Sequence, residues 1–171
     1  MPSLSVIIPC YNQGPYLVEA IGSALKQNIK DLQIIIVDDG STDEKTNILN
    51  QLEDKIAVVW FRQQNQGVAA ARNFGVTKAS KEYIAFLDAD DLWHSEKIKT
   101  QFDAMQTGKE ILFTGISQFI SPELMSEKLK GIEIKNKILP GICPSTYLSH
   151  VHTFARVGNF DEKLKLGEFI A

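Results

Sequence analysis

The chain has 171 residues, of which 44% are hydrophobic and 23% are charged, and its formal net charge is −3 at pH 7. These values are typical of one soluble globular domain that is large enough to bury a core. Interspersed charges of both signs argue against a nucleic-acid-binding surface. No apolar run approaches the roughly 20 residues of a membrane span, and we find no signal peptide. We therefore expect a cytoplasmic protein without a nucleic-acid partner, and peripheral association with the inner face of the membrane stays open.

Apolar runs alternate with amphipathic segments over the first 110 residues. Strands are expected at residues 4–9, 32–37, 56–61 and 83–87, and helices at residues 16–27 and 68–78, around 48–52 and after Ser95 as N-cap. The strands are apolar on both faces, which is typical of a parallel sheet covered by helices on each side. The sequence thus predicts an α/β fold.

The pattern weakens after residue 110. Residues 111–120 are expected to form another strand, interrupted at Gly115, and residues 122–138 form a short helix or a loop. The segment 140–171 carries no periodicity from which elements can be assigned.

Polar clusters follow three of the predicted strands directly. They are Tyr11-Asn12, Asp38-Asp39 and the run from Asp88 to Asp91. Parallel sheets bind ligands at the carboxyl ends of their strands. The sequence therefore predicts one site that contains all three clusters.

The acidic run after the fourth strand has two interpretations. Alternation brings Asp88 and Asp90 near one another, and gathered carboxylates repel unless a cation neutralises them. Their oxygens suit Mg²⁺ or Mn²⁺, which bind through one or two carboxylates and the substrate's phosphates. The alternative is a solvated turn that caps the next helix.

The other polar residues also leave two roles open. Asp39 either caps a helix or accepts a hydrogen bond from a nucleobase. Tyr11 either stacks on a base or packs against the first helix. Arg72, on an alanine-rich helix, either meets a phosphate, orients an aspartate or is solvated.

Taken in order, five segments resemble the family 2 glycosyltransferases with the GT-A fold: SVIIPCYN, IIVDDGSTD, NQGVAAARNFG, YIAFLDADDLW and VGNFDE. The resemblance implies a mostly parallel, Rossmann-like sheet with helices on both faces. It also implies inverting transfer of a sugar from a nucleoside-diphosphate sugar, with a UDP-sugar favoured, to an unknown glycan or lipid-linked acceptor. Mg²⁺ or Mn²⁺ would assist the reaction.

The resemblance assigns roles by motif. The residues that would bind the nucleotide are Pro9, Tyr11, Asn12, Asp38, Asp39, Arg72 and Asp88. Asp88 would also act in catalysis beside the ribose or donor sugar, and Asp90 would hold the metal. Many members carry an acidic pair after the Gly-x-Phe-Asp-Glu segment, whereas here Phe169 follows Glu168. Either Glu168 is the general base, or the base lies beyond the sequence, or this branch lacks it.

We expect residues 1–171 to be a single GT-A domain that is truncated at its C-terminal end. Residues 1–107 would form the nucleotide-binding half, and residues 108–171 would begin the acceptor-side half. The sequence contains neither GxGxxG nor GxxxxGK[ST], which argues against dinucleotide-dependent dehydrogenases and P-loop NTPases. The alternative function is a non-catalytic module that binds a nucleotide sugar or serves as a scaffold.

Overall fold

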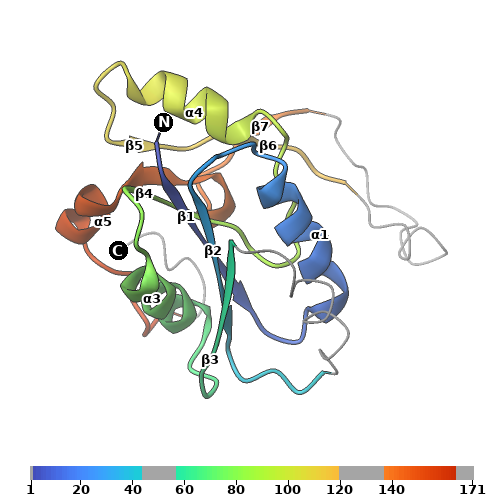
Figure 1. Ribbon diagram of the computed structural model, residues 1–171. Coiled ribbons are helices and arrows are strands. Elements are labelled where there is room, and N and C mark those ends of the chain that lie inside the picture. The colour runs from blue at the N-terminus through green and yellow to red at the C-terminus, as the bar shows by residue number, and fades with distance from the viewer. Residues whose placement is uncertain (1, 44–56, 120–136, 165–171) are drawn as a thin grey trace.

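A six-stranded mixed sheet, in the order β3-β2-β1-β4-β8-β5, forms the centre of the molecule (Figure 1). The computed structural model describes residues 2–43, 57–119 and 137–164. Along these residues the elements are β1 (Leu4–Cys10), α1 (Gly14–Leu25), β2 (Leu32–Asp38), β3 (Val58–Arg62), α3 (Val68–Lys78), β4 (Tyr83–Phe86), α4 (Lys97–Met105), β5 (Ile111–Leu112), β6 (Gly115–Ile116), β7 (Leu139–Pro140), the 3₁₀ helix η2 (Pro144–Thr146), β8 (Leu148–His150) and α5 (Val151–Val157).

The first four strands of the chain are parallel to one another, as the sequence predicts. In the register of the sheet, Leu4 on β1 lies between Leu32 on β2 and Tyr83 on β4. β8 and β5 then extend the sheet in the antiparallel sense, and β6 and β7 form a separate two-stranded sheet. The parallel arrangement brings the carboxyl ends of β1, β2 and β4 to one edge.

Helices cover both faces of the sheet because alternate side chains of each strand point to opposite sides. On β2, Ile34 and Ile36 belong to the core cluster that packs against α1 and α4. Ile35 and Val37 belong to the cluster that packs against α3 and α5. Figure 1 shows α1 and α3 on opposite sides of the strands. The continuous apolar runs of the sequence therefore reflect burial on both faces.

Most predicted elements are confirmed with small shifts of their ends. α3 has the predicted bounds, whereas the predicted strand 111–120 is divided into β5 and β6. Ser95 as N-cap was wrong, because α4 begins after Glu96, which makes no side-chain capping bond. The helix predicted around 48–52 lies outside the described residues, as does most of 122–138. No helix in the described part of the chain is long and apolar enough to cross a membrane.

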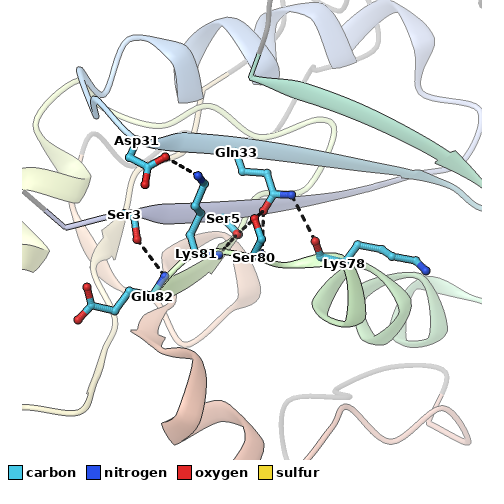
Figure 2. A network of polar contacts seen from close by, with 8 residues as sticks. All are labelled: Ser3, Ser5, Asp31, Gln33, Lys78, Ser80, Lys81 and Glu82. Atoms are coloured by element: carbon cyan, nitrogen blue, oxygen red, sulfur yellow. Dashed lines mark hydrogen bonds and ion pairs between the residues drawn. The ribbon is translucent and has the colours of Figure 1, made fainter.

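A polar network fixes the amino-terminal ends of the parallel strands (Figure 2). The Gln33 amide oxygen accepts hydrogen bonds from the Ser5 hydroxyl at 2.7 Å and from the Ser80 backbone at 3.0 Å. Lys81 donates its backbone N–H to the Ser5 oxygen and pairs through its ammonium with Asp31. The network satisfies the buried Ser5 hydroxyl and joins the turn after α3 to β1 and β2.

Helix α3 packs so closely on the sheet that position 75 requires glycine. A Cβ at Gly75 would lie 2.4 Å from Ile7 Cγ2, inside the core. We predict that Gly75→Ala lowers the free energy of unfolding by about 1–3 kcal/mol through overpacking. The matched control is Gly22→Ala on α1, where a Cβ meets no atom within 4 Å. It should raise stability by about 0.5–1 kcal/mol. Equal effects in urea unfolding would contradict the close packing of α3.

Candidate functional site

The three predicted polar clusters meet in a cleft of about 540 Å³ at the carboxyl ends of β1, β2 and β4. Of the residues assigned to the site from the sequence, six line this cleft: Pro9, Tyr11, Asp39, Arg72, Asp88 and Asp90. A larger hollow of about 740 Å³ lies beside the end of α1 and α4, where side chains such as Lys30 and Asp103 line it. None of those six residues contributes to it, so size does not identify the site here.

The loop after β1 presents Tyr11 to the cleft. Asn12 has the left-handed backbone conformation, with φ of 53°, and its side-chain oxygen accepts the backbone N–H of Thr42 at 2.8 Å. Its own N–H donates to the Ser41 hydroxyl at 2.9 Å. These bonds hold the loop against the turn after β2, and the Tyr11 side chain is left 48% exposed at the rim. Asn12 itself does not line the cleft, and its nucleotide contact stays a prediction.

The two aspartates that end β2 have different surroundings. Asp38 is buried, accepts the Ser41 N–H at 2.9 Å, and lies 3.8 Å from the Arg62 guanidinium. It does not line the cleft, so its predicted contact with the nucleotide also stays a prediction. Asp39 faces the loop before α3. Its carboxylate accepts the Gln66 N–H at 2.9 Å and the Gly67 N–H at 2.8 Å.

Asp39, which lines the cleft, also retains acceptor capacity. A carboxylate offers about four acceptor positions. Within the described chain, Oδ1 accepts from Gln63 and Gln66, whereas Oδ2 accepts from Gly67. One position on Oδ2 is therefore left for a donor on a ligand. Gly67 has a backbone φ of 96°, which residues with a side chain rarely adopt, so the geometry of this loop depends on glycine.

An ion pair joins α3 to the acidic turn. Arg72, only 3% exposed, donates to Asp88 Oδ1 at 2.7 Å. The Asp88 backbone N–H donates to the Ser145 hydroxyl at 3.0 Å. Charge-assisted bonds of this length are strong, and they fix the Asp88 carboxylate at the edge of the cleft. Of the alternatives left open for Arg72, the structure shows an arginine that orients an aspartate.

The remaining acids of the turn differ in exposure. Asp90 is exposed at the cleft, whereas Asp91 is partly buried. Burial raises the pKa of the Asp91 carboxyl above its ordinary value; the Ser145 hydroxyl opposes this, and the charges of Asp88 and Asp90 add to it. The described residues contain no group of three or more metal-binding side chains. An exposed carboxylate such as Asp90 nevertheless fits Mg²⁺ or Mn²⁺, which take their other ligands from phosphate and water.

A buried lysine supports the segment that follows the acidic turn. The Lys97 ammonium lies 4.2 Å from the centre of the Trp93 ring and donates to Gln101 at 2.8 Å. The Trp93 indole N–H donates to the Ser145 carbonyl at 2.8 Å. Burial lowers the pKa of Lys97 to about 7. Trp93 thus holds the backbone of Ser145, the residue whose hydroxyl contacts Asp88.

The depressed pKa of Lys97 predicts a pH-dependent stability. Between about pH 7 and the ordinary lysine pKa of 10.5, the unfolded chain binds more protons at this residue than the folded chain. Its contribution to stability therefore rises with pH through that window and is lost as pH falls toward 7. Lys97→Met should flatten this rise in urea unfolding from pH 7 to 10, whereas Lys99→Met, at an exposed position of the same helix, should leave it unchanged. If the free energy of unfolding of Lys97→Met rises with pH as steeply as that of the wild type, the lowered pKa of Lys97 is contradicted.

Sequence reasoning missed several residues of the cleft. Asn65 lines it, and its place just before a helix is a signal that could have identified it; at the neighbouring Gly67 the sequence did indicate close backbone approach. Gln13 also lines the cleft. Ser145 contacts the acidic turn from 57 residues away in the sequence. A contact between such distant residues leaves no pattern in a single sequence.

Comparison with known proteins assigns the family. The profile described as Glycosyl transferase family 2 matches residues 5–161, and the chain belongs to this family. The match covers all the segments that form the cleft. The mostly parallel sheet with helices on both faces is the GT-A fold predicted from the motifs.

Curated relatives carry glycosyltransferase names. The chain is 37% identical over 140 residues to an uncharacterized glycosyltransferase of Haemophilus influenzae, which covers 81% of this chain and 55% of the relative. It is 36% identical over 125 residues to the Escherichia coli UDP-Glc:alpha-D-GlcNAc-diphosphoundecaprenol beta-1,3-glucosyltransferase WfaP, covering 73% of this chain and 49% of that protein. The chain thus spans about half the length of these relatives.

Solved structures share the fold. Staphylococcus aureus TarS 1–349 in complex with UDP-GlcNAc superposes with a TM-score of 0.75 at 23% identity, covering 97% of this chain and 50% of that one. The mannosyltransferase PcManGT from Pyrobaculum calidifontis, in complex with GDP-Man and Mn²⁺, gives a TM-score of 0.67 at 20% identity, covering 95% and 48% of the two chains. At these identities the likeness concerns the fold.

Proposed function

We propose that this chain is the nucleotide-sugar-binding part of an inverting, metal-assisted glycosyltransferase. The observation that carries the proposal is the convergence of Tyr11, Asp39, Asp88 and Asp90 on one cleft at the ends of three neighbouring strands. The aromatic Tyr11 and the buried acceptor Asp39 suit the base, the half-buried Asp88 suits the ribose or donor sugar, and the exposed Asp90 suits the metal-bound diphosphate of a nucleoside-diphosphate sugar. Family membership supports the same assignment.

The base would lie between Tyr11 and Asp39. The half-exposed Tyr11 ring offers a face for stacking, and the remaining acceptor position on Asp39 would take an N–H from the base. The Asp39 carboxylate is buried, so an acceptor position that stays without a hydrogen bond costs free energy. A base without a matching N–H donor would therefore bind more weakly than the preferred base. Pro9 also lines the cleft, and Asn12 and Asp38 would support the base through the loops that they hold.

The diphosphate would lie toward the acidic turn. Asp90 would hold Mg²⁺ or Mn²⁺, and Asp88, held by Arg72, would orient the ribose or donor sugar. The bound cation would offset the charge on the leaving diphosphate. The exposure of Asp90 supports this role, because an ion bound to this carboxylate could take its other ligands from water and phosphate.

Inversion requires a base on the acceptor side that deprotonates the attacking hydroxyl. We assign this role to Glu168 on the resemblance alone, since it lies outside the described residues. Residues 1–107 would bind the nucleotide, and residues 108–171 would begin the acceptor-side half of one domain. UDP-sugar donors and a lipid-linked acceptor named for relatives support a UDP-sugar donor and a glycan or lipid-linked acceptor at the membrane surface.

UDP should stabilise the protein when Mn²⁺ is present. At roughly a hundred times its dissociation constant, a ligand adds about 2.7 kcal/mol, which corresponds to a rise in Tm of roughly 5–10 °C for a domain of this size. Asp90→Ala should abolish the Mn²⁺-dependent part of the shift. Asp103→Ala removes an exposed carboxylate of α4 outside the cleft and should leave the shift intact.

Thermal-shift measurements with UDP, GDP, CDP and dTDP, each with and without Mn²⁺, make this comparison. Wild-type protein that no nucleoside diphosphate stabilises would contradict the proposed donor site. An undiminished shift in Asp90→Ala would remove only the metal assignment.

Tyr11 and Asp39 should affect base recognition in different ways. Tyr11→Ala removes stacking worth about 1–3 kcal/mol per base and should weaken all four nucleotides by a similar factor. Asp39→Asn exchanges an acceptor for a donor and should weaken the preferred nucleotide most. Isothermal titration gives the four dissociation constants for each variant. An unchanged ranking in Asp39→Asn would mean that Asp39 only holds the loop before α3.

A further inference from the structure

Asn73, next to Arg72 on α3, binds a loop that is almost ninety residues away in the sequence. Its side chain, 9% exposed, donates to the Phe160 carbonyl at 3.0 Å and to Glu162 Oε1 at 2.8 Å. Its amide oxygen accepts the Phe160 N–H at 3.0 Å. One amide group therefore uses both its donor and its acceptor to hold residues 160–162, here called the clasped loop.

The clasped loop reaches the cleft through Arg72. The Arg72 guanidinium carbon lies 5.3 Å from the centre of the Phe160 ring, within the range of a cation–π contact. The same guanidinium donates to Asp88. Phe160 is itself fixed from behind by the Phe86 ring, whose centre is 5.1 Å away. A continuous set of contacts thus runs from the Asn73 amide through Phe160 and Arg72 to the Asp88 carboxylate.

We propose that Asn73 is a positioning residue for the donor site, acting through Phe160 and Arg72 on the Asp88 carboxylate. This inference rests on the proposed function. Asn73 does not line the cleft; it holds the backbone of Phe160, whose ring lies against Arg72. Because Arg72 and Asn73 are consecutive, one turn of α3 holds a donor-site carboxylate and a loop from the far end of the described chain.

A role in stability alone would not require this arrangement. An asparagine that only anchors a loop changes the fraction of folded protein when it is replaced, but the folded molecules bind ligand as before. An asparagine that sets the position of Asp88 changes the affinity of the folded molecules. Urea unfolding shows whether Asn73→Ala is folded under the titration conditions, and titration calorimetry of the folded variant then gives the dissociation constant of the site.

The test is titration of the protein with UDP in the presence of Mn²⁺. Asn73→Ala should raise the dissociation constant about tenfold, by analogy with the loss of residues that orient metal ligands. The control is Thr77→Ala on the same helix, whose hydroxyl donates only to the Phe74 carbonyl one turn back among the described residues. It should bind like the wild type. A wild-type dissociation constant in folded Asn73→Ala overturns the proposal.

A charge exchange tests the clasp itself. Asn73→Asp places a carboxylate against Glu162 and should weaken binding, whereas adding Glu162→Gln restores an amide–carboxylate contact and should recover part of the affinity. A double variant that binds no better than Asn73→Asp contradicts the clasp. If Asn73→Ala does not fold, Phe160→Leu, which removes the ring under Arg72, should raise the dissociation constant similarly, and unchanged binding overturns the proposal. Wild-type protein that does not bind UDP with Mn²⁺ contradicts the proposed UDP-sugar donor instead.

Discussion

The ion pair between Arg72 and Asp88 is the interaction on which the arrangement of the site depends. A buried guanidinium needs a compensating carboxylate, because an uncompensated charge in the interior is strongly destabilising. Arg72 is almost fully buried, and Asp88 supplies that carboxylate from the end of β4 at 2.7 Å. The pair therefore joins α3 to the acidic turn, which also carries Asp90 at the cleft. The same Arg72–Asp88 pair therefore compensates a buried charge and holds a carboxylate at the cleft.

Segments distant in the sequence meet around this pair. Ser145 holds the Asp88 backbone from one side, and Phe160 lies against Arg72 from the other. Both belong to the later part of the chain, which the sequence pattern left largely unassigned. The proposed nucleotide-binding half therefore depends on that later part, because residues of the proposed acceptor-side half contact Asp88 and Arg72.

The fold and the meeting of the polar clusters in one cleft could be predicted because they depend on local patterns. Apolar runs, turns with adjacent acids and a glycine before an alanine-rich helix identified the parallel strands, α3 and the cluster at the strand ends. The different surroundings of Asp38 and Asp39 could not be predicted, because they depend on which backbone N–H groups each carboxylate accepts. The contacts of Asn73 and Ser145 are equally invisible, since each joins residues more than fifty positions apart.

The most direct test of the site is to locate a bound metal relative to the acidic turn. In a ¹H–¹⁵N spectrum of the protein saturated with UDP and Mg²⁺, trace Mn²⁺ broadens the signals of nearby amides. We predict that the amides of Asp88, Asp90 and Asp91 lose intensity first, while those of Lys30 and Asp103, beside the other hollow, keep theirs. Broadening that begins at Lys30 or Asp103 and spares Asp90 would contradict the assignment of the cleft as the nucleotide and metal site.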